Sequence, residues 1–398
     1  MRIVFLTHFS LNSVEWKSNK IIIESATESM AKYSKTIKNL EIDDIELIKL
    51  DKFESFANVY FVLYTSKIPT SFLDQLNKYD RNFESRLVIP IFGNLTSRFS
   101  HWPRIFDKLK NHKIHFLFSS QSSLEQGRKI LGRIKSSLCF YPLSSNYTKS
   151  EKWIKSKEVI KFCYVGRCNT AKGFFQTLKA FRKACSLDNN IKLYIAGEFD
   201  RWCYQLHGMT DDENKYFEFC FKYKKILGDK IIFLDYLSQK ELKNLLRQCH
   251  GFISPSTFHD EDFGIACAQA LSQGCIPLLT DWGGYKYYNK HFNTYELKIS
   301  KTSENIPKMN INELVKGIVQ FSFDQKLAGS NSEIAKAKFS GNEFVLNIMN
   351  VCKEDNFLSF LGPSKLYELY LEKRKADLAI FQNGKNTDLY FELYSSYY

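Results

Sequence analysis

Cysteine is absent before residue 139, and where it occurs its spacing does not favour metal binding. The closest of the ten cysteines, Cys163 and Cys168, are separated by four residues. No C-x-x-C pair and no Cys/His spacing typical of zinc sites occurs in the chain. We therefore expect buried, reduced thiols, no disulfide framework and no metal cofactor.

Long apolar runs are also lacking. The short apolar stretch within Met1–Phe9 is not followed by a small-residue cleavage pattern, so no signal peptide is expected. No segment approaches the ~20 consecutive apolar residues that a membrane-spanning helix needs. We expect a cytoplasmic protein that is either soluble or held peripherally on the inner face of the membrane.

Acidic residues are in the minority: 56 Lys and Arg face 43 Asp and Glu, which gives a formal net charge of +13. A basic balance favours phosphorylated ligands, nucleic acid or an anionic membrane surface. The charges are spread along the chain and no nucleic-acid-binding module is recognisable, so nucleic acid is not expected as a partner. The 398 residues, 44% of them hydrophobic, suit two domains with separate cores.

Strand-like and helix-like segments alternate in two consecutive regions, residues 1–150 and 151–355. Such alternation predicts βαβ units and a mainly parallel sheet in each region, hence an α/β protein with two Rossmann-like domains facing a cleft. The polar stretch Leu143–Lys157 is typical of a linker. Residues 356–398 are helical in pattern and then aromatic-rich, and we expect them to cross back onto the N-terminal domain. The expected strands are Ile3–Leu6, Ile45–Leu50, Val59–Tyr64, Leu87–Phe92, His115–Phe118, Ile160–Val165, Lys192–Ala196, Ile231–Leu234, Gly251–Ser254 and Ile276–Thr280.

The segment Gly166–Gly173, GRCNTAKG, lies between an expected strand and an expected helix. Ligands of such folds bind beyond the carboxyl ends of the strands. Gly166 permits a tight turn, and Arg167 and Lys172 place two cations beside a helix N-terminus, where they suit a diphosphate. Taken alone, the two cations fit an ordinary basic surface better than a ligand site, because Arg and Lys are common near surface turns.

A second polar segment, Ser254–Leu271, also joins a strand to a helix, which we expect to begin near Asp262. Backbone N–H groups of the first turn lack partners within a helix and are available to phosphate or sugar oxygens. Glu261 precedes these groups, and Gln269 lies two turns further along the same helical face. The alternative is that the acidic residues 260–262 only cap the helix. A third strand-to-loop transition contains Gly283-Gly284, which favours close approach to a ligand but also fits a plain turn.

Taken in order, these pieces resemble the retaining GT-B glycosyltransferases of family 4. The family pattern is matched by GRCNTAKG (Gly166–Gly173), SPSTFHDEDFG (Ser254–Gly264), ALSQGCIP (Ala270–Pro277) and DWGG (Asp281–Gly284). Several pieces in one order are far more specific than any one alone. The resemblance covers the second domain, whereas the first is matched only in outline. It implies transfer of a sugar from a nucleoside-diphosphate sugar to an acceptor hydroxyl with retention of configuration, without a metal or other cofactor.

The resemblance also implies roles for individual residues. Arg167 and Lys172 would bind the donor diphosphate, and Glu261 would contact hydroxyls of the donor sugar. The family's second glutamate, which holds the ribose, is replaced here by Gln269. An amide still donates and accepts hydrogen bonds but lacks a carboxylate's charge. The further donor-binding candidates in these loops are Gly166, His259, Asp262, Phe263, Gly264 and Ile265.

The first domain departs from the family pattern, because no glycine follows the first strand and no histidine follows the strand that ends near Phe92. His8, Asn94 and Thr96 are candidates for the cleft or the acceptor, and a structural role in turns or caps is the alternative. The basic, aromatic segment 98–113 is expected either to dock on an anionic membrane or to be an ordinary packed helix.

Two functions follow from these residues. The first is a glycosyltransferase of bacterial surface-glycan or glycoconjugate assembly, with a glycan, lipid-linked or protein acceptor. The second is a degenerate, non-catalytic GT-B protein that binds a partner or a glycan.

Overall fold

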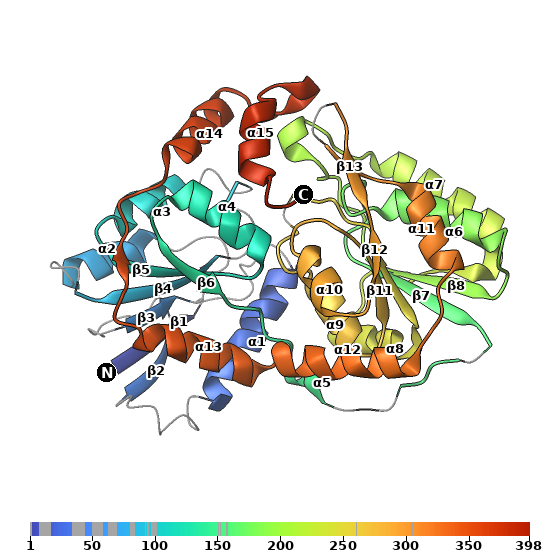
Figure 1. The fold of residues 1–398 in the computed structure, drawn as a ribbon, viewed down its shortest axis with the longest axis horizontal. Helices are drawn as coiled ribbons and strands as arrows, with labels where there is room; N and C mark the ends of the chain where they lie inside the picture. The colour runs from blue at the N-terminus through green and yellow to red at the C-terminus, as the bar shows by residue number, and fades with distance from the viewer. Residues whose placement is uncertain are drawn as a thin grey trace. The chain divides into compact units, whose positions relative to one another are not determined.

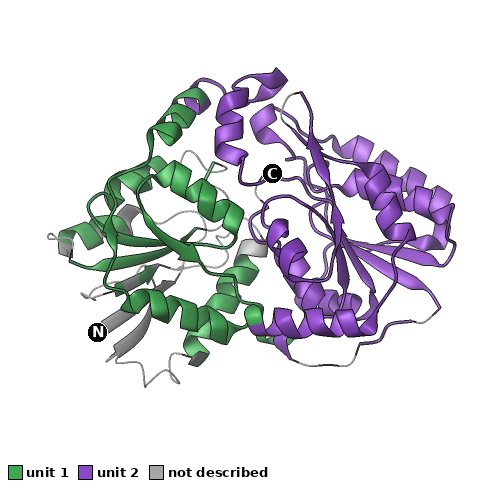
Figure 2. Cartoon of the chain, in the orientation of Figure 1, with its two compact units in different colours: residues 1–146, 338–373 green, residues 147–337, 374–398 purple. Residues whose placement is uncertain are grey.

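The structure is a computed structural model of the 398-residue chain. It describes residues 2–7, 17–33, 44–49, 59–62, 70–79, 84–91, 93, 95–96, 102–149, 151, 153–156, 158–259, 261–303 and 306–398. The chain divides into two compact units, each with its own α/β core (Figure 1, Figure 2). The first unit comprises residues 1–146 and 338–373, and the second comprises residues 147–337 and 374–398. The expected α/β class with mainly parallel sheets is confirmed.

The sheet of the first unit has the strand order β15-β5-β4-β3-β1-β2, with β6 pairing β5. Its strands run parallel except β15, which pairs antiparallel with β5. The elements of this unit are β1 (Arg2–Thr7), α1 (Lys17–Tyr33), β2 (Asp44–Lys49), β3 (Val59–Val62), α2 (Thr70–Tyr79), β4 (Arg86–Ile91), α3 (Trp102–Leu109), β5 (Lys113–Phe118), α4 (Gln121–Leu131), β6 (Lys135–Leu138), α13 (Gly341–Lys353), β15 (Leu358–Ser359) and most of α14 (Lys365–Ala376).

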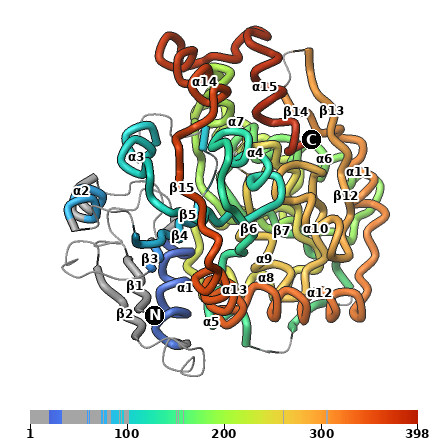
Figure 3. Tube along the Cα trace, turned by 60° about the vertical axis from the view of Figure 1, so that its left-hand side comes forward, coloured from blue at the N-terminus to red at the C-terminus, as the bar shows by residue number. Residues whose placement is uncertain are grey.

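The chain returns to the first unit at residue 338, so that α13 packs along α1 (Figure 1, Figure 3). The apolar residues Phe344, Ile348 and Met349 of α13 share a buried cluster with Ile23 and Met30 of α1. This burial explains why a helix so distant in sequence belongs to the first unit. The aromatic tail, residues 374–398, belongs instead to the second unit.

The sheet of the second unit is parallel throughout, in the order β12-β11-β10-β7-β8-β9. Helix α6 shows how it is built: its apolar residues recur at helical spacing and bury Phe174, Leu178 and Phe181. The elements are α5 (Ser145–Thr148), β7 (Ile160–Val165), α6 (Phe174–Cys185), β8 (Ile191–Ala196), η3 (Gln205–His207), α7 (Glu213–Leu227), η4 (Gly228–Lys230), β9 (Ile231–Phe233), α8 (Gln239–Gln248), β10 (Gly251–Ser254), α9 (Ile265–Ser272), β11 (Ile276–Thr280), α10 (Tyr285–His291), β12 (Tyr295–Leu297), β13 (Ile299–Lys301), β14 (Pro307–Met309), α11 (Ile311–Val319), α12 (Gln325–Lys338), η5 (Gln382–Gly384) and α15 (Thr387–Tyr394).

The ten cysteines are free thiols, and all but Cys220 are buried. Across the described ranges, no cluster of three or more His, Cys, Asp or Glu side chains is arranged to hold a metal ion. Within the same ranges, no helix combines the length and the apolar character that crossing a bilayer requires.

Candidate functional site

The loop between β7 and α6 is held in one shape by its glycines and by its own strand. Gly166 has a φ of 151° and Gly173 a φ of 75°, both in the region that favours glycine. A Cβ atom at Gly173 would lie 2.6 Å from the carbonyl oxygen of Pro255. The loop can therefore pack against the residues that follow β10 only because residue 173 is a glycine. The Tyr164 hydroxyl of β7 donates to the Arg167 carbonyl oxygen at 2.6 Å.

Residues that follow β8 hold the same loop from the other side. The buried Asn169 side chain accepts from the Lys172 amide at 2.8 Å and donates to the Trp202 carbonyl oxygen at 3.0 Å. The Asp211 carboxylate accepts from the amide and the hydroxyl of Thr170, both at 2.6 Å. The position of the loop is therefore set before any ligand arrives.

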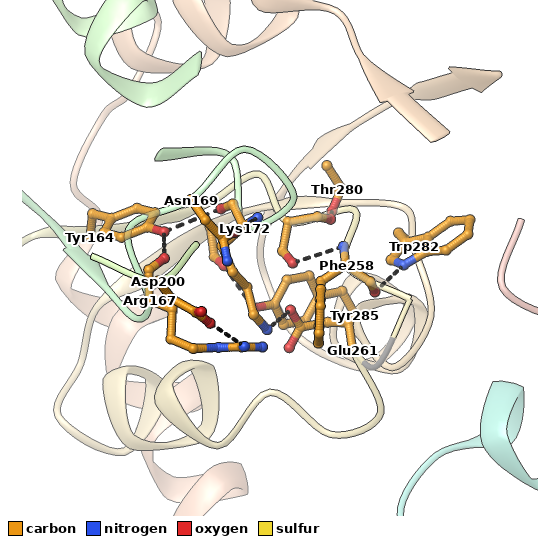
Figure 4. A network of polar contacts seen from close by, with 12 residues as sticks. Tyr164, Arg167, Asn169, Lys172, Asp200, Phe258, Glu261, Thr280, Trp282 and Tyr285 are labelled. Atoms are coloured by element: carbon orange, nitrogen blue, oxygen red, sulfur yellow. Dashed lines mark hydrogen bonds and ion pairs between the residues drawn. The ribbon is translucent and has the colours of Figure 1, made fainter. Parts of the chain in front are cut away.

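The two cations of the loop both lie over the Phe258 ring. The Arg167 guanidinium carbon is 4.4 Å and the Lys172 Nζ is 4.8 Å from the ring centroid, within cation–π range. Arg167 Nη1 lies 2.5 Å from Asp200 Oδ2, and Lys172 Nζ lies 2.7 Å from Glu261 Oε2 (Figure 4). The Glu261 side chain is only 6% exposed. The structure thus brings the three residues predicted to carry the chemistry, Arg167, Lys172 and Glu261, into one cluster.

The loop that carries Glu261 rests on the residues after β11. The Gly284 amide donates to the Glu261 carbonyl oxygen at 2.8 Å, and Trp282 Nε1 donates to the Phe258 carbonyl oxygen at 2.8 Å. A Cβ atom at Gly284 would lie 1.8 Å from the Asp262 carbonyl oxygen. The paired glycines therefore let the Glu261 loop pack closely against the residues that follow β11. This close approach is a contact within the protein, whereas the sequence favoured either an approach to a ligand or a plain turn.

Helix α9 begins at Ile265, three residues later than we expected from Asp262. Gly264 is its N-cap and is left-handed, with a φ of 73°, and the Phe263 side chain is buried near the ring of Tyr288. The backbone amides of Phe263, Gly264 and Ile265 thus lie at the entry to this helix, and their contact with a ligand stays a prediction.

Gln269 is buried in α9, and its Nε2 donates to Oε1 of Gln239 at the start of α8, at 2.9 Å. Two neutral amides therefore stand together where the family resemblance places a carboxylate. His259 is also buried, and this burial lowers its pKa to about 3, with further lowering by the nearby His207, Arg167, Arg374 and Lys172. The His259 imidazole is neutral at physiological pH and adds no positive charge to the cluster.

The candidates from the first unit are less informative. His8 and Asn94 lie outside the described residues. Thr96 is buried, and its carbonyl oxygen accepts from the Tyr370 hydroxyl at 2.6 Å. That contact joins the turn after β4 to α14, in line with the structural alternative for Thr96.

Several residues that hold the site were not singled out from the sequence. Asp200 and Asp211 follow β8, and a signal for them existed, because the carboxyl ends of neighbouring parallel strands meet at one edge. The aromatic tail supports the loop of Trp282: the Gly283 amide donates to the Tyr397 carbonyl oxygen at 3.0 Å, and the Trp282 and Tyr397 rings lie 5.4 Å apart. No local pattern predicts that long-range contact.

Comparison with known proteins identifies the part of the chain that holds this site. Residues 146–338 match the model of the family described as "Glycosyl transferases group 1". This part of the chain is therefore similar to the group 1 glycosyl transferases. Among curated proteins, the uncharacterized glycosyltransferase YqgM of Bacillus subtilis (strain 168) is 28% identical over 130 residues, 32% of each chain. A GDP-mannose:cellobiosyl-diphosphopolyprenol alpha-mannosyltransferase of Xanthomonas oryzae pv. oryzae (strain PXO99A) is 33% identical over 119 residues, 30% of this chain and 28% of that one.

These matches span about a third of the length of the curated relatives or less. Solved structures match over much more of the chain. Anabaena Alr3699/HepE, in complex with UDP and glucose, has a TM-score of 0.56 at 12% identity and covers 88% of this chain and 99% of its own. Sucrose-phosphate synthase from Thermosynechococcus elongatus has a TM-score of 0.58 at 10% identity and covers 88% of this chain and 98% of its own. The fold is therefore GT-B, as the sequence predicts.

Proposed function

We propose that the chain transfers a sugar from a nucleoside-diphosphate sugar to an acceptor hydroxyl with retention of configuration. The observation that carries this proposal is the cluster of Arg167, Lys172 and Glu261, which lie in the loops that follow β7 and β10. The group 1 domain and the solved relative in complex with UDP and glucose support the same reading. The proposed acceptor is a glycan, a lipid-linked molecule or a protein. The proposed role is in the assembly of bacterial surface glycans, such as lipopolysaccharide, or of other glycoconjugates.

Arg167 and Lys172 supply the charge that the reaction needs. As the glycosidic bond to the nucleoside diphosphate breaks, negative charge grows on the leaving phosphate, and preorganised cations stabilise it. In the structure each cation faces a carboxylate, Asp200 or Glu261, so the phosphate oxygens would take over part of those contacts. The exchange keeps both cations neutralised throughout, which limits the desolvation that a buried, unpaired cation would cost.

Glu261 is assigned to binding and positioning. Its carboxylate holds Lys172, and its backbone is fixed by Gly284 and Phe258, so it is placed to accept from sugar hydroxyls beside the diphosphate. Retention in this proposal needs no enzyme nucleophile, and we assign none. No metal or other cofactor has a role in the proposed reaction.

The test is turnover with a panel of UDP- and GDP-sugars, read as release of the nucleoside diphosphate. Arg167→Ala is the site variant, and Lys326→Ala, which removes an exposed lysine of α12, is the matched control. The proposal predicts release by the parent chain and by the control, with a loss of about 10²-fold or more in Arg167→Ala. The anomeric configuration of the product, read by NMR, tests retention separately.

A non-catalytic GT-B protein that binds a partner or a glycan is the second candidate. One observation favours it: an amide, Gln269, stands where a ribose-binding carboxylate is expected, and it is hydrogen-bonded to a second amide, Gln239, within the protein. This candidate predicts no turnover of any donor, together with binding of a glycan that survives Arg167→Ala.

A further inference from the structure

The exposed face of α7 carries large apolar side chains. Phe217 and Phe221, one helical turn apart, are 58% and 72% exposed, and Ile226 on the last turn is 46% exposed. Isolated exposed apolar residues are common, but adjacent phenylalanines on one helix face form a patch that marks an interaction site.

Helix α6 lies beside α7 and makes this face basic (Figure 1). The Phe175 and Phe219 rings of the two helices are 5.1 Å apart, and Lys179 Nζ lies 5.9 Å from the centroid of the Phe219 ring. No acidic residue occurs within α6. Its exposed cations are Lys179, Arg182 and Lys183.

The last turns of α7 add Lys222 and Lys225, which are exposed beside Phe221. Neither these two lysines nor the three cations of α6 form a salt bridge with any side chain in the described ranges. Lys224 differs, because its Nζ donates to the carbonyl oxygens of Gly228 and Ile231 at 2.9 Å each and so ends the helix. The exposed acids of α7 are Glu213, one turn before Phe217, and Glu218, so five cations face two carboxylates. The face therefore combines projecting aromatic rings with an excess of positive charge.

The described part of the segment that the sequence suggested for membrane docking, residues 102–113, has no such face. Within its described part, Trp102, Ile105, Phe106 and Leu109 of α3 are buried. The Phe106 ring contacts those of Trp102, Phe360 and Tyr367 inside the first unit. The apolar side of α3 belongs to the core, as in the packed-helix alternative, and Arg98 and Phe99 lie outside the described residues.

We propose that the α6–α7 face docks on an anionic lipid bilayer. Phe217 and Phe221 enter the interface between headgroups and acyl chains, while the five cations meet the lipid phosphates. The uncompensated positive charge favours an anionic bilayer over a second copy of this chain, which would bring like charges together. The proposal extends the proposed function, since it would bring the enzyme to lipid-linked acceptors, but lipid binding itself requires no turnover.

Sedimentation with vesicles tests the proposal on the full chain. One set of vesicles contains phosphatidylglycerol and phosphatidylcholine, and the other contains phosphatidylcholine alone. The parent chain should bind the anionic vesicles at least tenfold more tightly, because each basic residue near the surface contributes about fivefold. Two independent double variants, Phe217→Ser with Phe221→Ser and Lys222→Glu with Lys225→Glu, should each weaken binding at least tenfold.

The controls are matched in chemistry and lie elsewhere. Leu361→Ser removes a side chain that is 73% exposed in the first unit, and Lys290→Glu with Lys326→Glu repeats the charge change on α10 and α12. Both should bind within about twofold of the parent chain. Equal binding by parent and double variants, absence of binding by the parent, or a parent dimer that Phe217→Ser with Phe221→Ser converts to monomer would each overturn the proposal. Donor turnover measured without vesicles should be unchanged in both double variants, so a failure of docking is distinguished from a failure of the proposed function.

Discussion

The two ends of the candidate site in the second unit are built from different chemistry. At one end, Arg167 and Lys172 face Asp200 and Glu261 in close ion pairs. At the other, Gln269 meets Gln239 through a neutral amide hydrogen bond. The first end provides charge for a ligand that carries charge, and the second offers only donors and acceptors. For the proposed nucleotide-sugar donor, the difference would concentrate the binding energy at the diphosphate.

The largest expected effect comes from removing that charge. Arg167→Ala or Lys172→Ala should lower donor turnover by about 10²–10³-fold, because the leaving phosphate loses a preorganised cation. Arg167→Lys should recover only part of the loss, since a lysine cannot reproduce the guanidinium fork that faces Asp200. Steady-state kinetics with the best donor measures both, and an Arg167→Ala variant with parental turnover would remove the charged end from the mechanism.

The next effect tests whether the charged end depends on its supporting loop. In Gly284→Ala the added Cβ would meet the Asp262 carbonyl oxygen at 1.8 Å, so the Glu261 loop must shift. We expect a loss of about 2 kcal/mol in stability, together with at least tenfold lower turnover. Gly329→Ala is the control, because its Cβ would meet nothing closer than 3.9 Å. Chemical denaturation and turnover assays should both show a loss in Gly284→Ala. Gly329→Ala should keep the parental turnover and lose no stability, since alanine is favoured over glycine within a helix.

Much of the second unit could be predicted from the sequence, because its signals are local. The strands Ile160–Val165, Gly251–Ser254 and Ile276–Thr280 begin and end at the predicted residues, and a helix, Phe174–Cys185, follows Gly173 as expected. Their apolar runs and bordering turns depend on neighbouring residues alone. The cation-bearing loop follows from its place between one such strand and one such helix.

The partners of the cations could not be predicted with equal ease. Asp200 reaches Arg167 from a different strand end, and Tyr397 reaches Gly283 from a distance of more than a hundred residues in the chain. Such contacts depend on how separate segments pack, which no local periodicity encodes. The sequence prediction placed the start of α9 near Asp262 and was wrong for a local reason. The left-handed backbone of Gly264 is not helical, so the helix begins only at Ile265.

The amide end should respond more weakly. Gln269→Glu restores a carboxylate beside Gln239, whose Nε2 can donate to it. If this end holds a ribose, KM for the donor should fall by a few-fold, up to about tenfold, with little change in kcat. Gln239→Ala would leave the new carboxylate without that donor and should cancel the gain. An unchanged KM in Gln269→Glu would separate this end from donor binding.

The last prediction concerns how stability depends on pH, and it comes from His207, which lies near enough to His259 to lower the pKa of that residue. Burial lowers the pKa of His207 to about 4. Below about pH 6.5, His207 binds a proton in the unfolded state but stays neutral in the folded state. Stability is therefore lost as the pH falls from about 6.5 to 4. His207→Phe, in surroundings that include Tyr204, Phe381 and Tyr390, should reduce that slope by up to about 1.4 kcal/mol per pH unit. His115 in the first unit, whose pKa is also lowered to about 4, remains as an internal reference.

The most direct test of the central claim is a thermal shift with UDP and GDP on the parent chain and on Arg167→Ala with Lys172→Ala. A ligand that binds only the folded state at a hundred times its Kd stabilises it by about 2.7 kcal/mol. We predict that at least one nucleoside diphosphate raises the Tm of the parent by several degrees and leaves the double variant unchanged. Equal shifts in both proteins, or no shift in the parent with either nucleotide, would contradict a donor diphosphate site at Arg167 and Lys172.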